Sequence, residues 1–327
     1  MDLDLSCYVA GIKLNSPIMN ASGVCCTTVK QIEELDESQF LSAIVTKSCT
    51  MTPREGNPKP RYYGTSSFSI NSMGLANMSL KYYLKVAETF SKSKPVFLSL
   101  AGLSAEENVA MVKNVAASEQ HASGVELNLS CPNVPNKPQI AYDFEAMGDI
   151  LNRVFEVDLG NMPLGVKLPP YFDPVHFHQS ADVLRNYPKL RWVTCINSIG
   201  NGLYIDPITE ETVIHPKKGL GGLGGSFVKP TALANVKMFR ELLPEQVDII
   251  GCGGVLRGMD IFEHILCGAS AVQVGTYLQE NGIDGIPRLY HEFKDVMILK
   301  EYHTLDDFRG RLKTSPTIMN NKNDPAS

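Results

Sequence analysis

Two lysines stand at the ends of short apolar segments, where their charge could bind a ligand. Lys47 closes segment 43–47, and Lys167 lies near the end of segment 164–168. A lysine at such a position is most often a surface residue whose ammonium reaches water. Because both occur in strongly apolar surroundings, we expect the two ammonium groups to enter one site and to face an anion or an electron-rich ring.

Glycines follow two neighbouring apolar segments in the last third of the chain. Gly251-Cys252-Gly253-Gly254 ends one segment, and Gly275-Thr276 ends the next. Glycine lets a ligand approach the backbone closely, and backbone N–H groups at such turns bind phosphate in many α/β proteins. Glycines can also serve only to form tight turns. The occurrence of two such turns together favours a phosphate site.

Alternation along segment 125–130 separates polar from apolar side chains. Successive side chains of a strand point to opposite faces of the sheet. The apolar residues of this segment share one face and are expected to pack against helices. The inward face would then carry Glu126, Asn128 and Ser130.

Two other patterns imitate known motifs but lack the context these motifs need. Gly219-x-Gly221-x-x-Gly224 matches a dinucleotide-binding fingerprint, yet it follows two lysines rather than an apolar strand. We interpret it as a flexible, glycine-rich loop that can approach a flat ligand. His176 and His178 are two positions apart on an expected helix and point in different directions, so we expect no metal site there.

The elements that must position these residues are short apolar segments alternating with amphipathic ones, which is typical of buried strands and helices. Strands are expected at 18–21, 43–47, 95–101, 125–130, 164–168, 192–197, 247–252 and 271–275. Helices are expected at 28–40, 79–92, 143–157, 174–187, 231–243, 259–266 and 284–300, with one more after the capping box Ser104-x-x-Glu107.

Polar residues gather at the carboxyl ends of these strands. An open, doubly wound sheet also alternates strands and helices, but it concentrates ligand contacts near one switch point. A (β/α)8 barrel builds its site from many strand ends at once. We therefore predict an α/β fold, a single TIM barrel over 1–314 with its site formed at the C-terminal face by the long loops 48–78 and 198–228. The polar tail 315–327 is expected to be frayed.

Composition narrows the functional class. The hydrophobic fraction is 43%, and no apolar run is long enough to span a bilayer. The net charge of −5 argues against general attraction to nucleic acid. The eight cysteines have no metal-binding spacing, which is typical of reduced thiols. We expect a soluble, cytoplasmic protein without nucleic-acid or membrane partners.

Several motifs occur together in a specific order. Asn128-Leu129-Ser130-Cys131-Pro132-Asn133, Ile70-Asn71-Ser72-Met73-Gly74-Leu75 and Thr46-Lys47-Ser48 resemble the signature sequences of the dihydroorotate dehydrogenases. The resemblance continues through 20–23, 165–170, 197–202 and 253–254, and covers roughly residues 3 to 313. Members of this family use FMN to oxidise dihydroorotate to orotate in pyrimidine synthesis.

The resemblance implies a role for each matched position. Residues expected to bind FMN are Ala21, Ser22, Gly23, Lys47, Ser48, Asn128, Lys167, Gly225, Cys252, Gly253, Gly254, Gly275 and Thr276. Residues expected to bind the substrate are Lys47, Asn71, Met73, Gly74, Leu75, Asn128, Asn133, Asn197 and Ser198. Cys131 is expected to be the base that takes a proton from dihydroorotate, with segment 133–139 as a lid.

The resemblance also indicates a subclass. Membrane-bound members have a serine as the base, whereas this chain has Cys131, so it resembles class 1A. That class reduces fumarate to succinate in the same site and is usually a homodimer. Three alternatives remain open: an NAD-linked enzyme that needs a partner subunit, a non-redox phosphate-binding isomerase or lyase that uses Lys167, and a flavin-binding barrel without turnover.

Overall fold

Eight parallel strands form a closed barrel in the computed structural model, which describes residues 3–118, 122–130 and 139–314. The strand order is β3-β16-β15-β10-β9-β8-β7-β4, and a bridge between Met19 and Ala43 joins the first strand to the last. The predicted TIM barrel is therefore confirmed. The strands are β3 (Ile18–Asn20), β4 (Ile44–Val45), β7 (Val96–Leu100), β8 (Gly124–Asn128), β9 (Leu164–Leu168), β10 (Leu190–Cys195), β15 (Asp248–Cys252) and β16 (Ala271–Val274).

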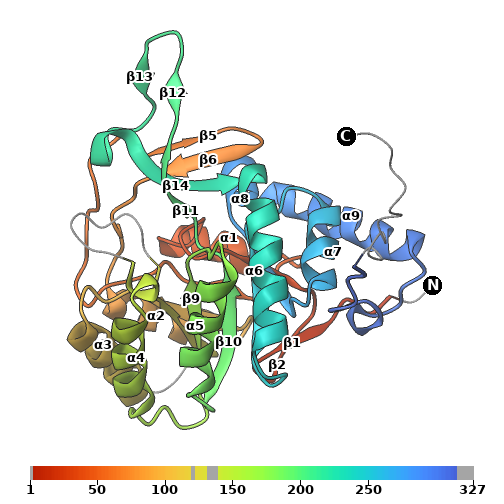
Figure 1. Cartoon of the computed structure of the whole chain (residues 1–327), viewed down its shortest axis with the longest axis horizontal. Helices are drawn as coiled ribbons and strands as arrows, with labels where there is room; N and C mark the ends of the chain where they lie inside the picture. The colour runs from red at the N-terminus through yellow and green to blue at the C-terminus, as the bar shows by residue number, and fades with distance from the viewer. Residues whose placement is uncertain (1–2, 119–121, 131–138, 315–327) are drawn as a thin grey trace, which may run out of the picture.

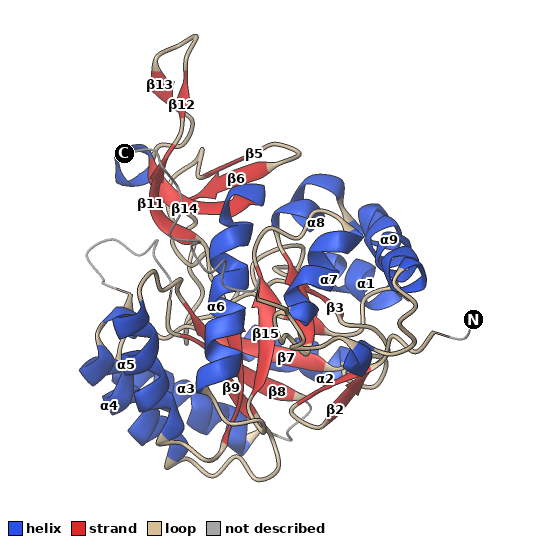
Figure 2. Cartoon of the chain, turned by 45° about the vertical axis from the view of Figure 1, so that its right-hand side comes forward, coloured by secondary structure: helices blue, strands red, loops and turns tan. Residues whose placement is uncertain are grey.

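Helices surround the barrel, as Figures 1 and 2 show. They are α1 (Val29–Glu37), α2 (Leu80–Phe90), α3 (Ala105–Ala117), α4 (Phe144–Phe155), α5 (Pro174–Arg185), α6 (Lys229–Leu242), α7 (Gly258–Leu266), α8 (Thr276–Asn281) and α9 (Ile286–Leu299). The sequence analysis did not predict α8. None of the described helices is long and apolar enough to cross a membrane.

Side chains before the helices explain where several of them begin. Thr28, Asp143 and Asp173 each accept a hydrogen bond from a backbone N–H of the first turn. Ser104 caps α3 in the same way, 3.1 Å from the nitrogen of Glu107. The reciprocal half of the predicted capping box does not form. Instead, the Glu107 carboxylate accepts hydrogen bonds from backbone N–H groups of two loops, at Met51 and Leu103.

Aromatic packing fills the barrel near the amino-terminal ends of its strands. Trp192 is fully buried and meets Phe97 edge-on, with ring centroids 5.5 Å apart. Gly165 makes room for the indole, because a Cβ there would lie 2.1 Å from Trp192. The hairpin of β1 (Cys7–Val9) and β2 (Ile12–Leu14) reaches the same end, where the nitrogen of Ala10 donates to Asp248. The polar site is therefore left to the opposite end.

The two long loops form an antiparallel sheet beside the carboxyl ends of the barrel strands. Its order is β11-β14-β6-β5, and a further hairpin of β12 and β13 projects from it (Figure 1). The strands are β5 (Tyr62–Gly64), β6 (Phe68–Asn71), β11 (Ile199–Leu203), β12 (Ile205–Asp206), β13 (Glu211–Thr212) and β14 (Leu220–Gly225).

The glycine-rich segment, interpreted from sequence as a flexible loop, is strand β14. That interpretation was wrong, because this strand pairs with β6 on one side and β11 on the other. Its glycines permit close packing. A Cβ on Gly221 would lie 2.6 Å from the carbonyl oxygen of Asn71, and one on Gly224 would lie 2.8 Å from the hydroxyl of Thr276.

Candidate active site

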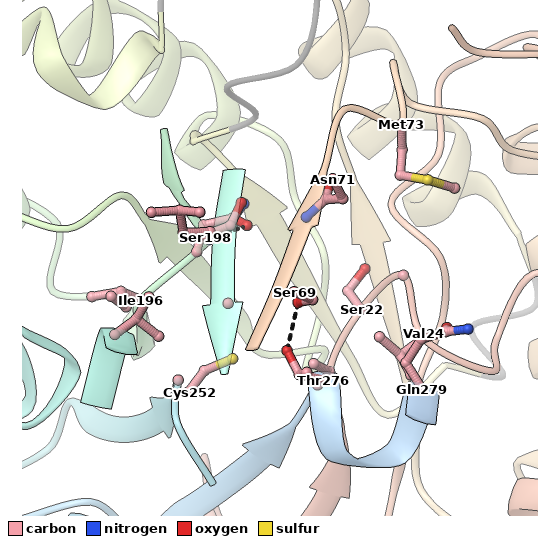
Figure 3. A pocket seen from close by; sticks show the side chains of 18 of the residues that line it. Ser22, Val24, Ser69, Asn71, Met73, Ile196, Ser198, Cys252, Thr276 and Gln279 are labelled. Carbon is pink, nitrogen blue, oxygen red and sulfur yellow. Dashed lines mark hydrogen bonds between the residues drawn. The ribbon is translucent and has the colours of Figure 1, made fainter. Parts of the chain in front are cut away.

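A cavity of about 310 Å³ lies between the carboxyl ends of the barrel strands and the sheet of β6 and β14. Figure 3 shows side chains of both meeting around it. Every predicted site residue within the described ranges lines this cavity. They are Ala21, Ser22, Gly23, Lys47, Ser48, Asn71, Met73, Gly74, Leu75, Asn128, Lys167, Asn197, Ser198, Gly225, Cys252, Gly253, Gly254, Gly275 and Thr276. The predicted Cys131 and Asn133, and the predicted lid except for Gln139, lie outside the described residues.

Both predicted lysines face the cavity and are buried in the protein. Lys167 extends from β9 with only 3% of its surface exposed, and Lys47 follows β4 with 8% exposed. The Lys167 ammonium donates to the side-chain oxygen of Gln273 at 2.8 Å and lies 3.8 Å from the sulfur of Cys252. Two buried cations give the cavity a positive potential, which suits an anionic ligand.

Amide and hydroxyl groups form a connected cluster at the ends of β8 and β10. Asn128 donates to the hydroxyl of Ser48 at 3.0 Å, and its carbonyl oxygen accepts from the amide of Asn197 at 3.2 Å. The same Asn197 amide contacts the Ser130 hydroxyl at 3.0 Å. Ser130 is fully buried and directly precedes Cys131 in the sequence. The cluster thus fixes the end of β8 from which the predicted base follows.

Glycines at the other end of the cavity adopt backbone conformations that side chains rarely allow. The φ angles are +127° at Gly253, +75° at Gly254 and +86° at Gly225. The carbonyl of Gly253 accepts a hydrogen bond from Nε2 of the buried His264 at 3.0 Å. Burial lowers the pKa of His264 to about 4, so its imidazole is neutral at pH 7.

The segment after Gly254 is fixed by one buried carboxylate. Asp260 accepts from the backbone nitrogens of Leu256 and Arg257, each at 2.8 Å. Its other oxygen pairs with the ammonium of Lys229 at 2.7 Å. These contacts fix the backbone that follows the glycine turn.

Sequence reasoning missed residues that link the added sheet to the barrel. Ser69 of β6 and Thr276 of α8 share a hydrogen bond of 2.7 Å, drawn in Figure 3. Tyr62 of β5 donates to Glu280 of α8. Tyr62 and Ser69 belong to loop 48–78, and the sequence of this loop has no helical or strand periodicity that would predict its position beside the cavity. Polar residues flanking the motif at 70–75 were the available hint.

Among the described residues, Cys252 lines the cavity and Cys26 accepts a hydrogen bond from the backbone of Gly23, which also lines it; both thiols are protonated at neutral pH. Burial raises the pKa of Cys26 to about 11, and burial also raises the pKa of Cys252 despite the nearby Lys167. Neither is suited to be a base. In the ranges the structure describes, no group of three or more His, Cys, Asp or Glu side chains could hold a metal ion.

A family model described as "Dihydroorotate dehydrogenase" matches residues 4–297. The chain belongs to the dihydroorotate dehydrogenase family. Curated relatives place it in class 1A, as predicted. It is 50% identical to "Dihydroorotate dehydrogenase (fumarate)" of Trypanosoma brucei brucei over 95% of this chain and 99% of that protein. It is 50% identical to "Dihydroorotate dehydrogenase A (fumarate)" of Lactococcus lactis subsp. cremoris, with the same coverage.

One solved structure shares the overall fold of this chain. A structure titled "Crystal structure of DHODH in complex with ferulenol from Eimeria tenella" superposes with a TM-score of 0.77. The two chains are 20% identical, and the match covers 94% of this chain and 88% of the other. At this identity the likeness supports the fold alone.

Proposed function

We propose that the protein oxidises (S)-dihydroorotate to orotate and reduces fumarate to succinate in the same site. The observation that carries the proposal is a single cavity lined by both buried lysines, the asparagine cluster and the glycine turns. The printed names of the relatives, which include fumarate, support the choice of substrates. The step would belong to pyrimidine synthesis.

The residues around the cavity fit FMN. Gly253 and Gly254 offer backbone N–H groups without side chains in the way, and Gly275 and Thr276 lie beside them on the next strand end. These four positions would hold the phosphate. The ring would lie against Ala21, Ser22, Gly23 and Gly225, with Lys167 at its pyrimidine end. When bound there, FMN would supply a hydride acceptor for dihydroorotate and a source of electrons for fumarate.

Lys47 and the asparagine cluster suit the substrate. The Lys47 ammonium would pair with the carboxylate of dihydroorotate, helped by the backbone at Met73, Gly74 and Leu75. Each asparagine amide offers a donor and an acceptor, as the pyrimidinedione ring requires. We assign Asn71, Asn128, Asn133, Asn197 and Ser198 to that ring.

Cys131 would take the proton that leaves the carbon next to the hydride donor. It follows the buried Ser130, whose position is fixed by Asn128 and Asn197. A positioned base contributes about 10²–10⁴ in rate. We further propose that the protein acts in the cytoplasm as a homodimer, which gel filtration with light scattering would test.

An anaerobic visible spectrum tests the proposal. The purified protein should show a flavin band that bleaches with dihydroorotate and returns with fumarate. A band that returns only with NAD⁺ and an added partner subunit would favour the NAD-linked branch. A flavin band that does not bleach with dihydroorotate would indicate a flavin-binding barrel without turnover. A protein with no flavin band after incubation with FMN would instead favour a non-redox phosphate-binding barrel.

A further inference from the structure

A buried carboxylate lies one side chain away from Lys167, inside the barrel. Glu126 extends inward from β8 and is 1% exposed. Its Oε2 atom accepts from the amide of Gln273 at 3.0 Å and from the hydroxyl of Thr194 at 2.7 Å. The other end of the Gln273 amide accepts from the Lys167 ammonium at 2.8 Å. The four side chains come from four different strands and form one chain of hydrogen bonds.

The chemistry of the end groups fixes the direction of every bond. An ammonium has only donors, so the Gln273 oxygen must face Lys167. The Gln273 nitrogen must then face Glu126, whose Oε2 is the acceptor. Gln273 is fully buried, so its amide has no room to exchange these partners with water. The Gln273 amide therefore connects Lys167 to Glu126 in one orientation, with its oxygen toward the cation and its nitrogen toward the carboxylate.

The Glu126 carboxylate compensates the positive charge of the buried Lys167. Glu126 and Asp260 are the two buried carboxylates in the described part of the chain, and Asp260 is paired with Lys229 on the outside of the barrel. A buried cation is costly unless other groups compensate it. Lys167 reaches its compensating carboxylate through Gln273, which leaves the ammonium itself free to face the cavity.

We propose that Glu126 and Gln273 are positioning residues that act through Lys167 to set the reduction potential of the bound flavin. This inference rests on the proposed function, because it requires FMN with its pyrimidine end beside Lys167. Gln273 holds the ammonium toward the ring. Glu126 offsets part of its charge, so that reduced flavin is stabilised enough to accept electrons from dihydroorotate but still passes them to fumarate.

The test is the midpoint potential of the flavin in Glu126→Gln, measured by anaerobic dye titration. Glutamine has the same shape and can still accept from Thr194 and Gln273, so mainly the charge changes. With that charge gone, the ammonium favours electron-rich reduced flavin more strongly. We expect the ratio of reduced to oxidised flavin at a fixed potential to rise about tenfold, which equals a shift of about +30 mV for a two-electron couple.

A second variant tests the link itself. Gln273→Met removes the acceptor that holds the ammonium, so we expect a less positive potential and weaker FMN binding. In that background Glu126→Gln should have a much smaller effect, because the ammonium whose charge Glu126 offsets is no longer held beside the ring. The matched control is Asp248→Asn, which removes a carboxylate at the far end of the barrel, where it binds Ala10 and Ser270. This control should destabilise the fold and leave the potential unchanged.

The outcomes separate the two claims. Wild-type protein that binds no FMN would overturn the proposed function, and the inference with it. Wild-type protein that titrates normally, with Glu126→Gln at the same potential, would overturn the inference alone. If Glu126→Gln does not fold, Gln273→Met decides the matter in the same assay, and an unchanged potential again overturns the inference.

Discussion

Gly254 packs so closely on Lys229 that a Cβ on the glycine would lie 2.3 Å from the Cβ of the lysine. Lys229 is held in turn by ion pairs to Asp260 and Glu263, both at 2.7 Å. The turn at one end of the cavity therefore has neither space for a side chain nor a neighbour that can move easily. Its φ of +75° adds a backbone penalty for any other residue.

Gly254→Ala should therefore weaken FMN binding by tenfold or more, roughly 1.4 kcal/mol, because the turn must shift to relieve the contact. FMN fluorescence during titration of the apoprotein measures the effect. The matched control is Gly11→Ala, which has a similar φ of +80° but nothing within 4 Å of the added Cβ. It should lower stability slightly and leave FMN affinity unchanged. Equal affinities for both variants would contradict this account of the turn.

The barrel could be predicted from the sequence because its strands are apolar and are bounded by residues that end a strand. Strand β9 matches its predicted range at both ends, since Pro163 and Pro169 flank it. Period-2 alternation also placed Glu126 and Asn128 on the inward face, where both make hydrogen bonds. Local pattern sufficed there because nearly every residue of these strands is buried.

The added sheet could not be predicted by the same reasoning. Strand β14 is mostly glycine, so it has almost no side-chain pattern, and it pairs with β6 about 150 residues earlier in the chain. Such pairing is fixed by tertiary packing rather than by local preference. The contacts of Tyr62 and Ser69 with α8 depend on that pairing. The asparagines and lysines that line the cavity could be predicted because they belong to the sequence motifs shared with the family.

Replacing Lys47 by methionine should weaken orotate binding and preserve the flavin spectrum. A charge-assisted hydrogen bond to a carboxylate contributes about 1.5–3 kcal/mol, which corresponds to roughly 10- to 150-fold in affinity. The perturbation of the flavin absorbance by orotate gives the dissociation constant. Lys13→Met is the control, because Lys13 is exposed on β2. Orotate binding equal to that of the wild type would remove Lys47 from the substrate site.

Cys131→Ala should leave FMN and orotate bound but slow flavin reduction. Loss of a positioned base costs about 10²–10⁴ in rate, and stopped-flow single-turnover absorbance would measure it. Cys267→Ala, at the end of α7 on the outside of the barrel, is the matched control and should react at the wild-type rate. An unchanged rate in Cys131→Ala would exclude the thiol as the base.

Acid should destabilise the fold through His264. Its Nε2 donates to the Gly253 carbonyl, while its buried Nδ1 has no partner among the described residues and faces Gly251. Protonation would place a charge there. Burial is the main reason that the pKa falls to about 4 from 6.5; Lys229 lowers it further, while Asp260 and Glu263 oppose the shift.

The unfolded chain therefore binds a proton between pH 6.5 and about 4 that the folded protein does not, so the free energy of unfolding falls as the pH falls through this window. The loss is about 3 kcal/mol at the acid end, from 1.36 kcal/mol for each pKa unit.

Urea unfolding at several pH values measures this loss of stability. His264→Gln should be less stable at pH 7 but should lose less stability on acidification than the wild type. His178→Gln, which changes an exposed histidine, should keep the wild-type slope. Parallel slopes for wild type and His264→Gln would show that the proton is taken up elsewhere.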